Sequence, residues 1–187
     1  MFEEFTGKAH VPAITFEAVK LATGLDWFEV TSKDQLPKAP GVYCWVDPET
    51  DLVHYHGAGE GASGLWTRLG NQLRFRTYQR DRIAAAETED DMFWVLAESP
   101  AIRMAAETNV HPWAAVAREP EWRLDDVDDD ALPSSARGWE SFIYECSHLV
   151  AGRRSLLGGG AWESKHGSLG SVMENVAWSR LRNIHDK

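Results

Sequence analysis

The chain has 187 residues, of which 43% are apolar, and a formal net charge of −10. This length favours a single domain spanning residues 1–187, and no apolar run approaches the roughly 18–20 residues of a membrane span, so no membrane partner is expected. The first ten residues lack the basic and apolar regions of a signal peptide and the two cysteines lie far apart, which favours a cytoplasmic protein without disulfides or a zinc site.

The first part of the chain predicts a helix and then a hairpin. Residues 15–24, TFEAVKLATG, place apolar side chains at helical spacing, and Gly24 is suited to end a helix. The segments GVYCWV and LVHYHG are rich in β-branched and aromatic residues and flank the turn sequence DPETD. They predict an antiparallel hairpin from Gly41 to Gly57. His54 and His56 lie two apart on its second strand, where we expect an exposed pair.

A basic helix is predicted next. In residues 65–79, LWTRLGNQLRFRTYQ, the side chains of Leu65, Leu69 and Leu73 share one face. Five arginines gather over this helix in an otherwise acidic chain: Arg68, Arg74, Arg76, Arg80 and Arg82. They form either a solvated helix face or a surface for a polyanion such as nucleic acid. In the second case, the nucleic-acid contacts are expected from Arg74, Arg76 and Arg80.

The second half of the chain predicts two strands and two helices. Residues 91–99 and 112–119 are strand candidates, and an acidic loop with five aspartates follows at 125–130. Residues 134–154 have the clearest amphipathic helical pattern. A final helix is expected over residues 171–185, opened by the capping box Ser171-x-x-Glu174.

The glycine-rich stretch after the hairpin admits a nucleotide-binding interpretation. Gly59-x-Gly61-x-x-Gly64 has the letter pattern of a dinucleotide loop. Such a loop follows the first strand of a parallel β-α-β unit, with an acidic residue about 20 positions on at the end of the next strand. Here the preceding strand belongs to an antiparallel hairpin, and the later positions fall in the arginine-rich helix. Nucleotide binding is therefore the less favoured alternative.

The segment LPKAPGVYCW followed by VHYHG resembles the GIY-YIG nuclease superfamily. The family's opening stretch Leu-Pro-x-x-Pro-Gly-[Ile/Val]-Tyr is matched from Leu36 to Tyr43. Its second signature, Tyr-[Ile/Val]-Gly, is matched at Tyr55-His56-Gly57 with histidine in the middle position. A helix beginning Leu-x-x-Arg-Leu follows, matched at residues 65–69, and Gln72 stands where the family often has histidine.

This resemblance implies an α+β fold with a small antiparallel sheet of about three strands flanked by helices. It covers residues 36–73 well and resumes at the long helix. The family-like core would span roughly residues 36–160, with an insertion within about 80–130 and extra terminal helices.

The resemblance also implies an endonuclease that hydrolyses phosphodiester bonds, most simply in DNA, with Mg²⁺ or Mn²⁺. Tyr43 would orient or deprotonate the attacking water, Tyr55 would complete the phosphate pocket, and Arg68 would bind the phosphate. The metal-binding glutamate depends on the alignment. The longer family pattern, Glu-Ala-x-x-x-Glu, points to Glu145, which we prefer, and the shorter Glu-x-x-Leu-Ile pattern points to Glu140.

A second hypothesis is a catalytically weakened module of the same kind that binds a nucleic acid or a protein. It is favoured by the net charge of −10, by His56 and Gln72, and by the lack of the family's Pro-x-x-Asn in residues 153–162. The acidic loop at 125–130 could mimic DNA, cover the site or solubilise the chain.

Overall fold

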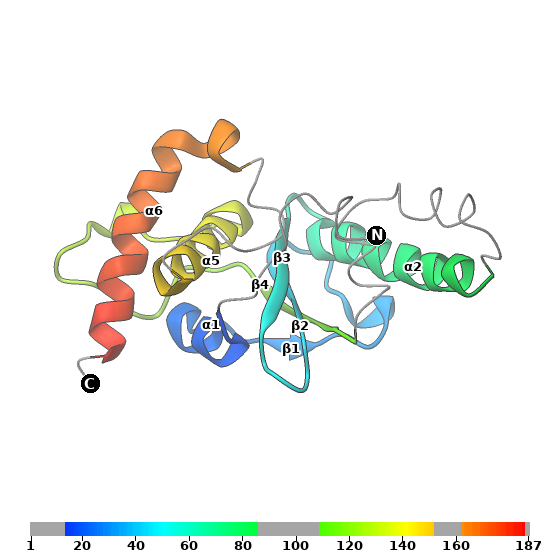
Figure 1. Ribbon diagram of the computed structural model, residues 1–187. Helices are drawn as coiled ribbons and strands as arrows, with labels where there is room; N and C mark the ends of the chain where they lie inside the picture. The colour runs from blue at the N-terminus through cyan, green and yellow to red at the C-terminus, as the bar shows by residue number, and fades with distance from the viewer. Residues whose placement is uncertain (1–13, 86–108, 152–161, 186–187) are drawn as a thin grey trace.

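A computed structural model describes residues 14–85, 109–151 and 162–185 (Figure 1). The strands are β1 (Phe28–Glu29), β2 (Gly41–Val46), β3 (Val53–Gly59) and β4 (His111–Val116). The helices of the described part are α1 (Phe16–Thr23), α2 (Gly64–Ala85), α5 (Ala136–Ala151) and α6 (Trp162–His185), with the short 3-10 helices η2 (Lys33–Gln35) and η3 (Asp129–Ala131). The expected strand at 91–99 lies outside the described residues. None of the described helices has the length and apolar character needed to cross a bilayer.

The sheet is antiparallel throughout, with the strand order β1-β4-β2-β3. The expected hairpin is present, and its second arm continues to Gly59. The strand predicted from residue 112 is β4, which pairs with the other side of β2. The α+β prediction is confirmed, with the short β1 adding a fourth strand to the expected three. This order leaves β3 at one edge of the sheet.

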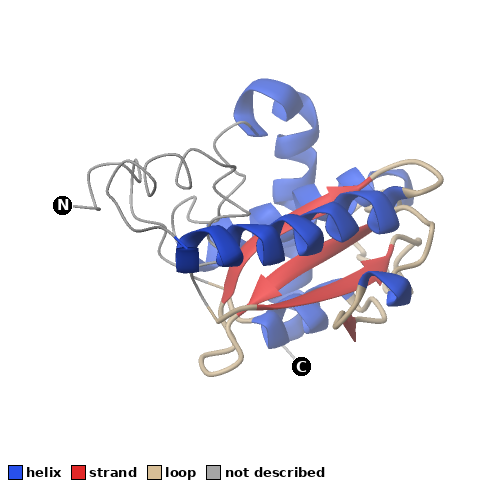
Figure 2. Ribbon diagram, turned by 90° about the vertical axis from the view of Figure 1, so that its right-hand side faces the viewer, coloured by secondary structure: helices blue, strands red, loops and turns tan. Residues whose placement is uncertain are grey.

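The sheet separates two buried clusters because side chains alternate along each strand. Val42, Cys44 and Val46 of β2 face the cluster formed with α1, α5 and α6. Tyr43 and Trp45 face the opposite cluster, formed with α2. Figure 2 shows α2 lying across one face of the sheet, with other helices behind it. Both tyrosines of the family signature therefore lie on the α2 side.

The glycine-rich turn allows the backbone at the end of β3 to pack closely against the backbone at the start of α2. A Cβ atom at Gly59 would meet the backbone of Gly64, and one at Gly64 would meet the backbone of Gly59. Gly61 has φ of +74°, a conformation that glycine adopts without strain. These glycines let α2 start directly beside the end of β3. No parallel β-α-β unit occurs among the described strands, so the structural basis of a dinucleotide loop is missing.

The helix ends agree with local signals in one case and not in another. Thr15 accepts a hydrogen bond from the Ala18 amide at the start of α1, and Gly24 ends that helix with φ of +63°. The prediction that Ser171 opens the last helix is wrong, since α6 already begins at Trp162. A capping residue must lie at the end of a helix, and here helical backbone continues on the N-terminal side of Ser171.

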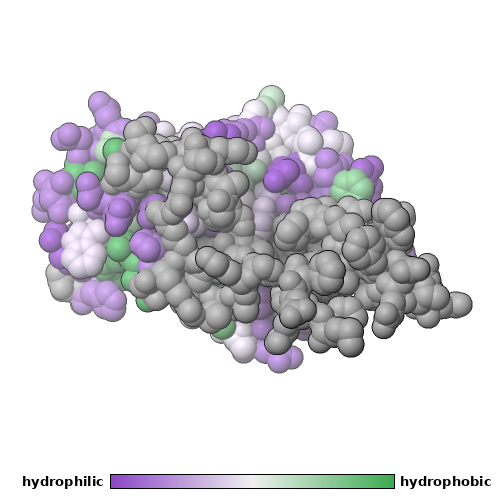
Figure 3. All heavy atoms as spheres, turned by 45° about the horizontal axis from the view of Figure 1, so that its top comes forward, coloured by the Kyte–Doolittle hydropathy of each residue, from purple (hydrophilic) through white to green (hydrophobic). Residues whose placement is uncertain are grey.

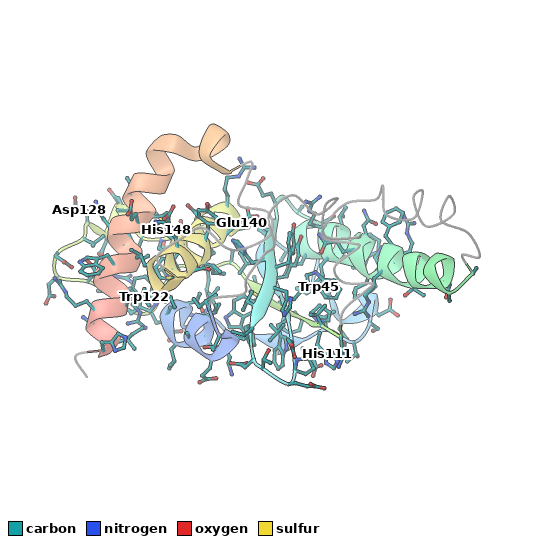
Figure 4. The ribbon with its side chains drawn as sticks, in the orientation of Figure 1. Trp45, His111, Trp122, Asp128, Glu140 and His148 are labelled. Atoms are coloured by element: carbon teal, nitrogen blue, oxygen red, sulfur yellow. The ribbon has the colours of Figure 1, made fainter. Side chains whose placement is uncertain are left out.

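The acidic loop packs beside α6. The carboxylate of Asp126 accepts hydrogen bonds from Ser179 Oγ at 2.9 Å and from Arg182 at 2.7 Å. Asp128 lies at the α6 side of the molecule in Figure 4, well away from the labelled Glu140. The loop at Asp128 therefore does not lie over Glu140.

Candidate active site

Tyr43 and Tyr55 lie together on the α2 side of the sheet. Tyr43 is paired with Gly57 across the hairpin, and the two tyrosine rings are 6.0 Å apart between centroids. The Tyr43 ring crosses over Gly57, where an added Cβ atom would lie 2.5 Å from the Tyr43 hydroxyl. The glycine of the second signature thus makes room for the tyrosine of the first.

Helix α2 brings two polar side chains to these phenols. The exposed Arg68 guanidinium lies within hydrogen-bonding reach of the hydroxyls of both Tyr43 and Tyr55. One turn later, Gln72 donates from Nε2 to the Tyr43 hydroxyl at 2.8 Å. Its Oε1 accepts from Nε1 of Trp45 at 2.9 Å. Gln72 therefore anchors the helix to β2 and holds the Tyr43 hydroxyl in place.

The environment keeps Tyr43 protonated. Burial raises the pKa of its hydroxyl well above the usual value, Tyr55 raises it further, and Arg68 lowers it. Interaction with Tyr43 raises the pKa of the Arg68 guanidinium, which keeps its positive charge. The site therefore holds a protonated Tyr43 beside a fixed cation.

The structure distinguishes the two candidate glutamates. Five residues along a helix correspond to about 140° around its axis, so Glu140 and Glu145 point in different directions. Glu140 is half-buried, accepts a hydrogen bond from the Ala58 amide of β3 and interacts electrostatically with Arg68. Glu145 is 2% exposed and lies beside Cys146. Of the two candidates, Glu140 is therefore the one that interacts with Arg68 and with the end of β3.

Burial raises the pKa of Glu140 to about 7. The guanidinium groups of Arg137 and Arg68 lower this pKa, and the carboxylate of Glu60 raises it. Glu140 therefore exchanges its proton near neutral pH, which is uncommon for a carboxyl group and frequent at functional sites.

His56 connects this glutamate to the sheet. Its Nε2 donates to the Glu140 backbone oxygen at 3.2 Å, and its ring stacks on Tyr144 with centroids 6.2 Å apart. Burial lowers the pKa of His56 to about 4, so the ring is neutral at pH 7. The expected exposed pair is wrong for His56, which is 3% exposed, because α5 covers this part of β3.

The predicted nucleic-acid contacts of α2 do not share one surface. Arg74 is exposed, with its guanidinium 4.8 Å from the Phe75 ring centroid. Arg76 is half-buried, packs 5.1 Å from the Trp45 ring and donates to the Val110 carbonyl oxygen at 3.4 Å. The Arg80 side chain lies outside the described residues. Arg76 therefore has a packing role, and Arg74 is the described arginine of the predicted set that faces solvent.

A metal at this site would depend on few protein ligands. Among the described residues, no three His, Cys, Asp or Glu side chains come together to hold an ion. A lone carboxylate fits Mg²⁺, which keeps several waters and shares phosphate oxygens with its substrate. Glu140 meets this requirement, since the hydrogen bond from Ala58 leaves other lone pairs of its carboxylate available.

Three polar residues at the site were not among the sequence candidates. Gln72 was noted only as a departure from the family's histidine, although its position four residues after Arg68 places the two near each other on the helix surface. Glu60 and Arg137 form an ion pair of 2.6 Å beside Glu140. They are 77 positions apart in the chain, and no local pattern relates them.

Comparison with known proteins adds no relative. The chain matches no protein-family model, and neither the curated proteins nor the solved structures gave a significant match. The resemblance to GIY-YIG nucleases therefore rests on the sequence motifs from Leu36 to Leu69.

Proposed function

We propose that this protein is a divergent GIY-YIG-type nuclease that hydrolyses phosphodiester bonds in nucleic acid, with DNA as the first substrate to test. The observation that carries the proposal is that Arg68 lies within reach of the hydroxyls of Tyr43 and Tyr55 and also acts on the Glu140 carboxyl, which accepts from the edge strand β3. These residues come from β2, β3, α2 and α5, and local packing alone gives no reason to gather a cation, two phenols and a titrating carboxyl.

Each side chain has a role that its surroundings allow. Arg68 would bind the scissile phosphate with its planar donor fork and stabilise the charge that develops on its oxygens. Glu140 as a carboxylate would hold Mg²⁺ or Mn²⁺, which when bound neutralises phosphate charge and lowers the pKa of a coordinated water. Gln72 and His56 would keep Tyr43 and Glu140 in position.

The two tyrosines differ in access to substrate. Tyr43 is 0% exposed and Tyr55 is 7% exposed. Because the Tyr43 hydroxyl is engaged by Gln72, Tyr55 and Arg68, we assign Tyr55 the direct contact with the phosphate or the attacking water. Tyr43 would orient Tyr55 and Arg68. This assignment revises the sequence expectation, which gave the water to Tyr43.

The second candidate is a binding module of the same fold that has lost cleavage. It is favoured by the complete burial of Tyr43, whose raised pKa makes it a poor base, and by the partial protonation of Glu140 at neutral pH. Such a module would keep the phosphate contact of Arg68 without assembling a metal site.

The test is cleavage of labelled single-stranded and duplex DNA, and of RNA, with Mg²⁺ or Mn²⁺. Glu140→Gln keeps the shape of the side chain but removes the charge that holds the metal, so cleavage should fall by about 10²-fold or more while binding survives. Arg68→Gln should weaken both. Glu145→Gln is the matched control and should keep cleavage, with thermal unfolding confirming that each variant folds.

The outcomes separate the hypotheses. Loss of cleavage in Glu145→Gln but not in Glu140→Gln would restore the longer alignment. Binding that depends on Arg68, without cleavage of any of these substrates by the wild type, would establish the binding module. Neither binding nor cleavage would refute both proposals.

A further inference from the structure

An ion pair spans the space between the end of β3 and the start of α5. Glu60 follows the last residue of β3, and Arg137 lies in the first turn of α5. Arg137 Nη2 and Glu60 Oε2 are 2.6 Å apart, and the side chains remain 47% and 55% exposed. Both groups act on the Glu140 carboxyl, which places the pair at the candidate active site.

Two residues of α5 face two residues at the end of β3. Arg137 and Glu140 are three apart on α5 and share one face of the helix. Ala58 and Glu60 are two apart at the end of β3. The amide of Ala58 donates to Glu140, and the next carboxylate along the chain binds Arg137. Arg137 and Glu140 thus meet the same short segment of the edge strand, with Arg68 near the same carboxyl.

The ion pair between Arg137 and Glu60 contributes little to the stability of the fold. An ion pair between partly exposed side chains stabilises a fold by only about 0–1 kcal/mol, since water and salt screen it. A phosphate offers the guanidinium two parallel charge-assisted hydrogen bonds, which suits arginine better than a shared surface carboxylate. Exchange of Glu60 for a phosphate would therefore cost little.

We propose that Arg137 is a second phosphate-binding residue of this site, and that Glu60 occupies it as a competing anion until nucleic acid binds. Arg68 of α2 and Arg137 of α5 both act on the Glu140 carboxyl, so each would bind a phosphate near the proposed metal-binding carboxylate. The inference rests on the proposed function in its choice of ligand, a nucleic-acid backbone, and does not require that the protein cleaves it.

The proposal predicts changes of opposite sign for the two members of the pair. Arg137→Gln removes a phosphate contact and should weaken affinity roughly three- to tenfold, with the salt slope on duplex DNA reduced by about 0.9. Glu60→Gln removes the competitor and should strengthen affinity by a similar factor. The double variant should have an affinity close to that of Arg137→Gln, since the proposed effect of Glu60 on affinity is its occupation of Arg137.

The experiment measures binding of fluorescein-labelled duplex and single-stranded DNA by anisotropy over a salt series, in EDTA so that nothing is cleaved. Arg123→Gln and Asp129→Asn are the matched controls. They break a 3.2 Å ion pair with side-chain exposures of 51% and 71%, in the acidic loop away from the site. The controls report the effect of changed net charge alone. Thermal unfolding of all variants checks folding.

A structural clamp would give a different result. If the pair only fastened β3 to α5, both single variants would lower the melting temperature and shift binding in the same direction. That outcome would overturn the inference. So would equal affinities of Arg137→Gln and Arg123→Gln for DNA, or a wild type whose affinity for DNA does not depend on salt. If the wild type binds DNA through Arg137 but cleaves none of the substrates, the role of Arg137 is supported and only the nuclease proposal is refuted.

Discussion

Tyr43 can lie across β3 because Gly57, its partner in the hairpin, has no side chain. The added Cβ atom would lie 2.5 Å from the phenol oxygen and 2.6 Å from the carbon that carries it. Tyr43 is fully buried, and its hydroxyl is engaged by neighbouring side chains, so the ring has no free space into which it can move. A methyl group at position 57 must therefore displace the ring that organises the site.

We expect Gly57→Ala to destabilise the fold by about 1–3 kcal/mol, the usual cost of forcing extra volume into a packed region. Cleavage or binding should fall more than this stability loss explains, since the Tyr43 hydroxyl also positions Tyr55 and Arg68. Chemical denaturation and activity at a temperature where the variant is folded would measure both effects. Gly138→Ala is the control, because a Cβ there comes no closer than 3.3 Å to its neighbours and a helix favours alanine.

Glu140 makes the proposed activity depend on pH. Its raised pKa of about 7 means that the carboxyl is protonated below pH 7 and ionised above it. Metal binding requires the carboxylate, so cleavage at limiting Mg²⁺ should rise as the pH increases from 6 to 8 and should be recovered at low pH by more Mg²⁺. A rate at limiting metal that does not change over this range would contradict the assignment.

The same carboxyl affects folding stability. Its proton is held more tightly in the folded protein than in the unfolded chain, so its contribution is fully present below about pH 4.5 and is lost as the pH rises through about 7. Glu140→Gln has no carboxyl group to ionise, so its folding stability does not fall in this way as the pH rises. The variant should therefore exceed the wild type in free energy of unfolding by about 1–3 kcal/mol at pH 8, with a smaller difference at pH 5.

Helix α2 gives its arginines different tasks because its surface is divided by packing. Leu65, Leu69 and Leu73 form the buried face. Arg76 lies three residues after Leu73 and so follows the same face, where its guanidinium packs on Trp45. Arg68 lies beside this face and reaches the tyrosines, and Arg74 points to solvent. The basic segment is therefore partly structural and partly available to a ligand.

We expect Arg74→Glu to weaken DNA binding and to flatten its salt dependence, because one phosphate contact and its released counterion are lost. The melting temperature should change little, since Arg74 is exposed. Arg76→Glu should instead lower the melting temperature, because it leaves the Val110 carbonyl and the Trp45 ring without their cation. Binding that is unaffected by Arg74→Glu would show that this part of α2 is a solvated surface.

Charge is distributed unevenly over the described structure. The proposed site contains Arg68 and Arg137 together with Glu60 and Glu140. In the acidic loop, Asp126 pairs with Arg182 of α6 and Asp129 pairs with Arg123. In the view of Figure 3 the described surface is mostly hydrophilic, with some hydrophobic side chains toward its left-hand end. The net charge of −10 is therefore compatible with a local anion-binding site, since exposed charges farther apart than about 8–10 Å are largely screened at physiological salt.

Neutralising the acidic loop tests this separation. The triple variant Asp125→Asn, Asp128→Asn and Asp130→Asn should leave affinity for DNA within about twofold at 0.15 M salt, and should raise it only at low ionic strength. Cleavage at saturating substrate should not change. A large gain in affinity at physiological salt would mean that the loop competes with nucleic acid, as a DNA mimic would.

Much of the fold is encoded in patterns between near neighbours in the chain. The meeting of Tyr43, Tyr55 and Arg68, by contrast, joins a helix to the sheet and was expected only from the resemblance to a family. The hairpin follows from two β-rich segments around a turn, and α1 follows from its apolar spacing with Gly24 at its end. These features depend on backbone hydrogen bonding and conformation over a few residues, which the amino-acid types express directly. The start of α6 was missed because the letters of the capping box lie inside a longer helix.

The choice between Glu140 and Glu145 has a different origin. Both fit a family pattern on the same helix, and which one faces Arg68 depends on the rotation of α5 about its own axis. Contacts with β3, α1 and α6 set that rotation, through residues far away in the chain. The burial of His56 and the Glu60–Arg137 pair arise in the same way. Such contacts leave no local pattern, so the arrangement around the carboxylate could be read only from the packed molecule.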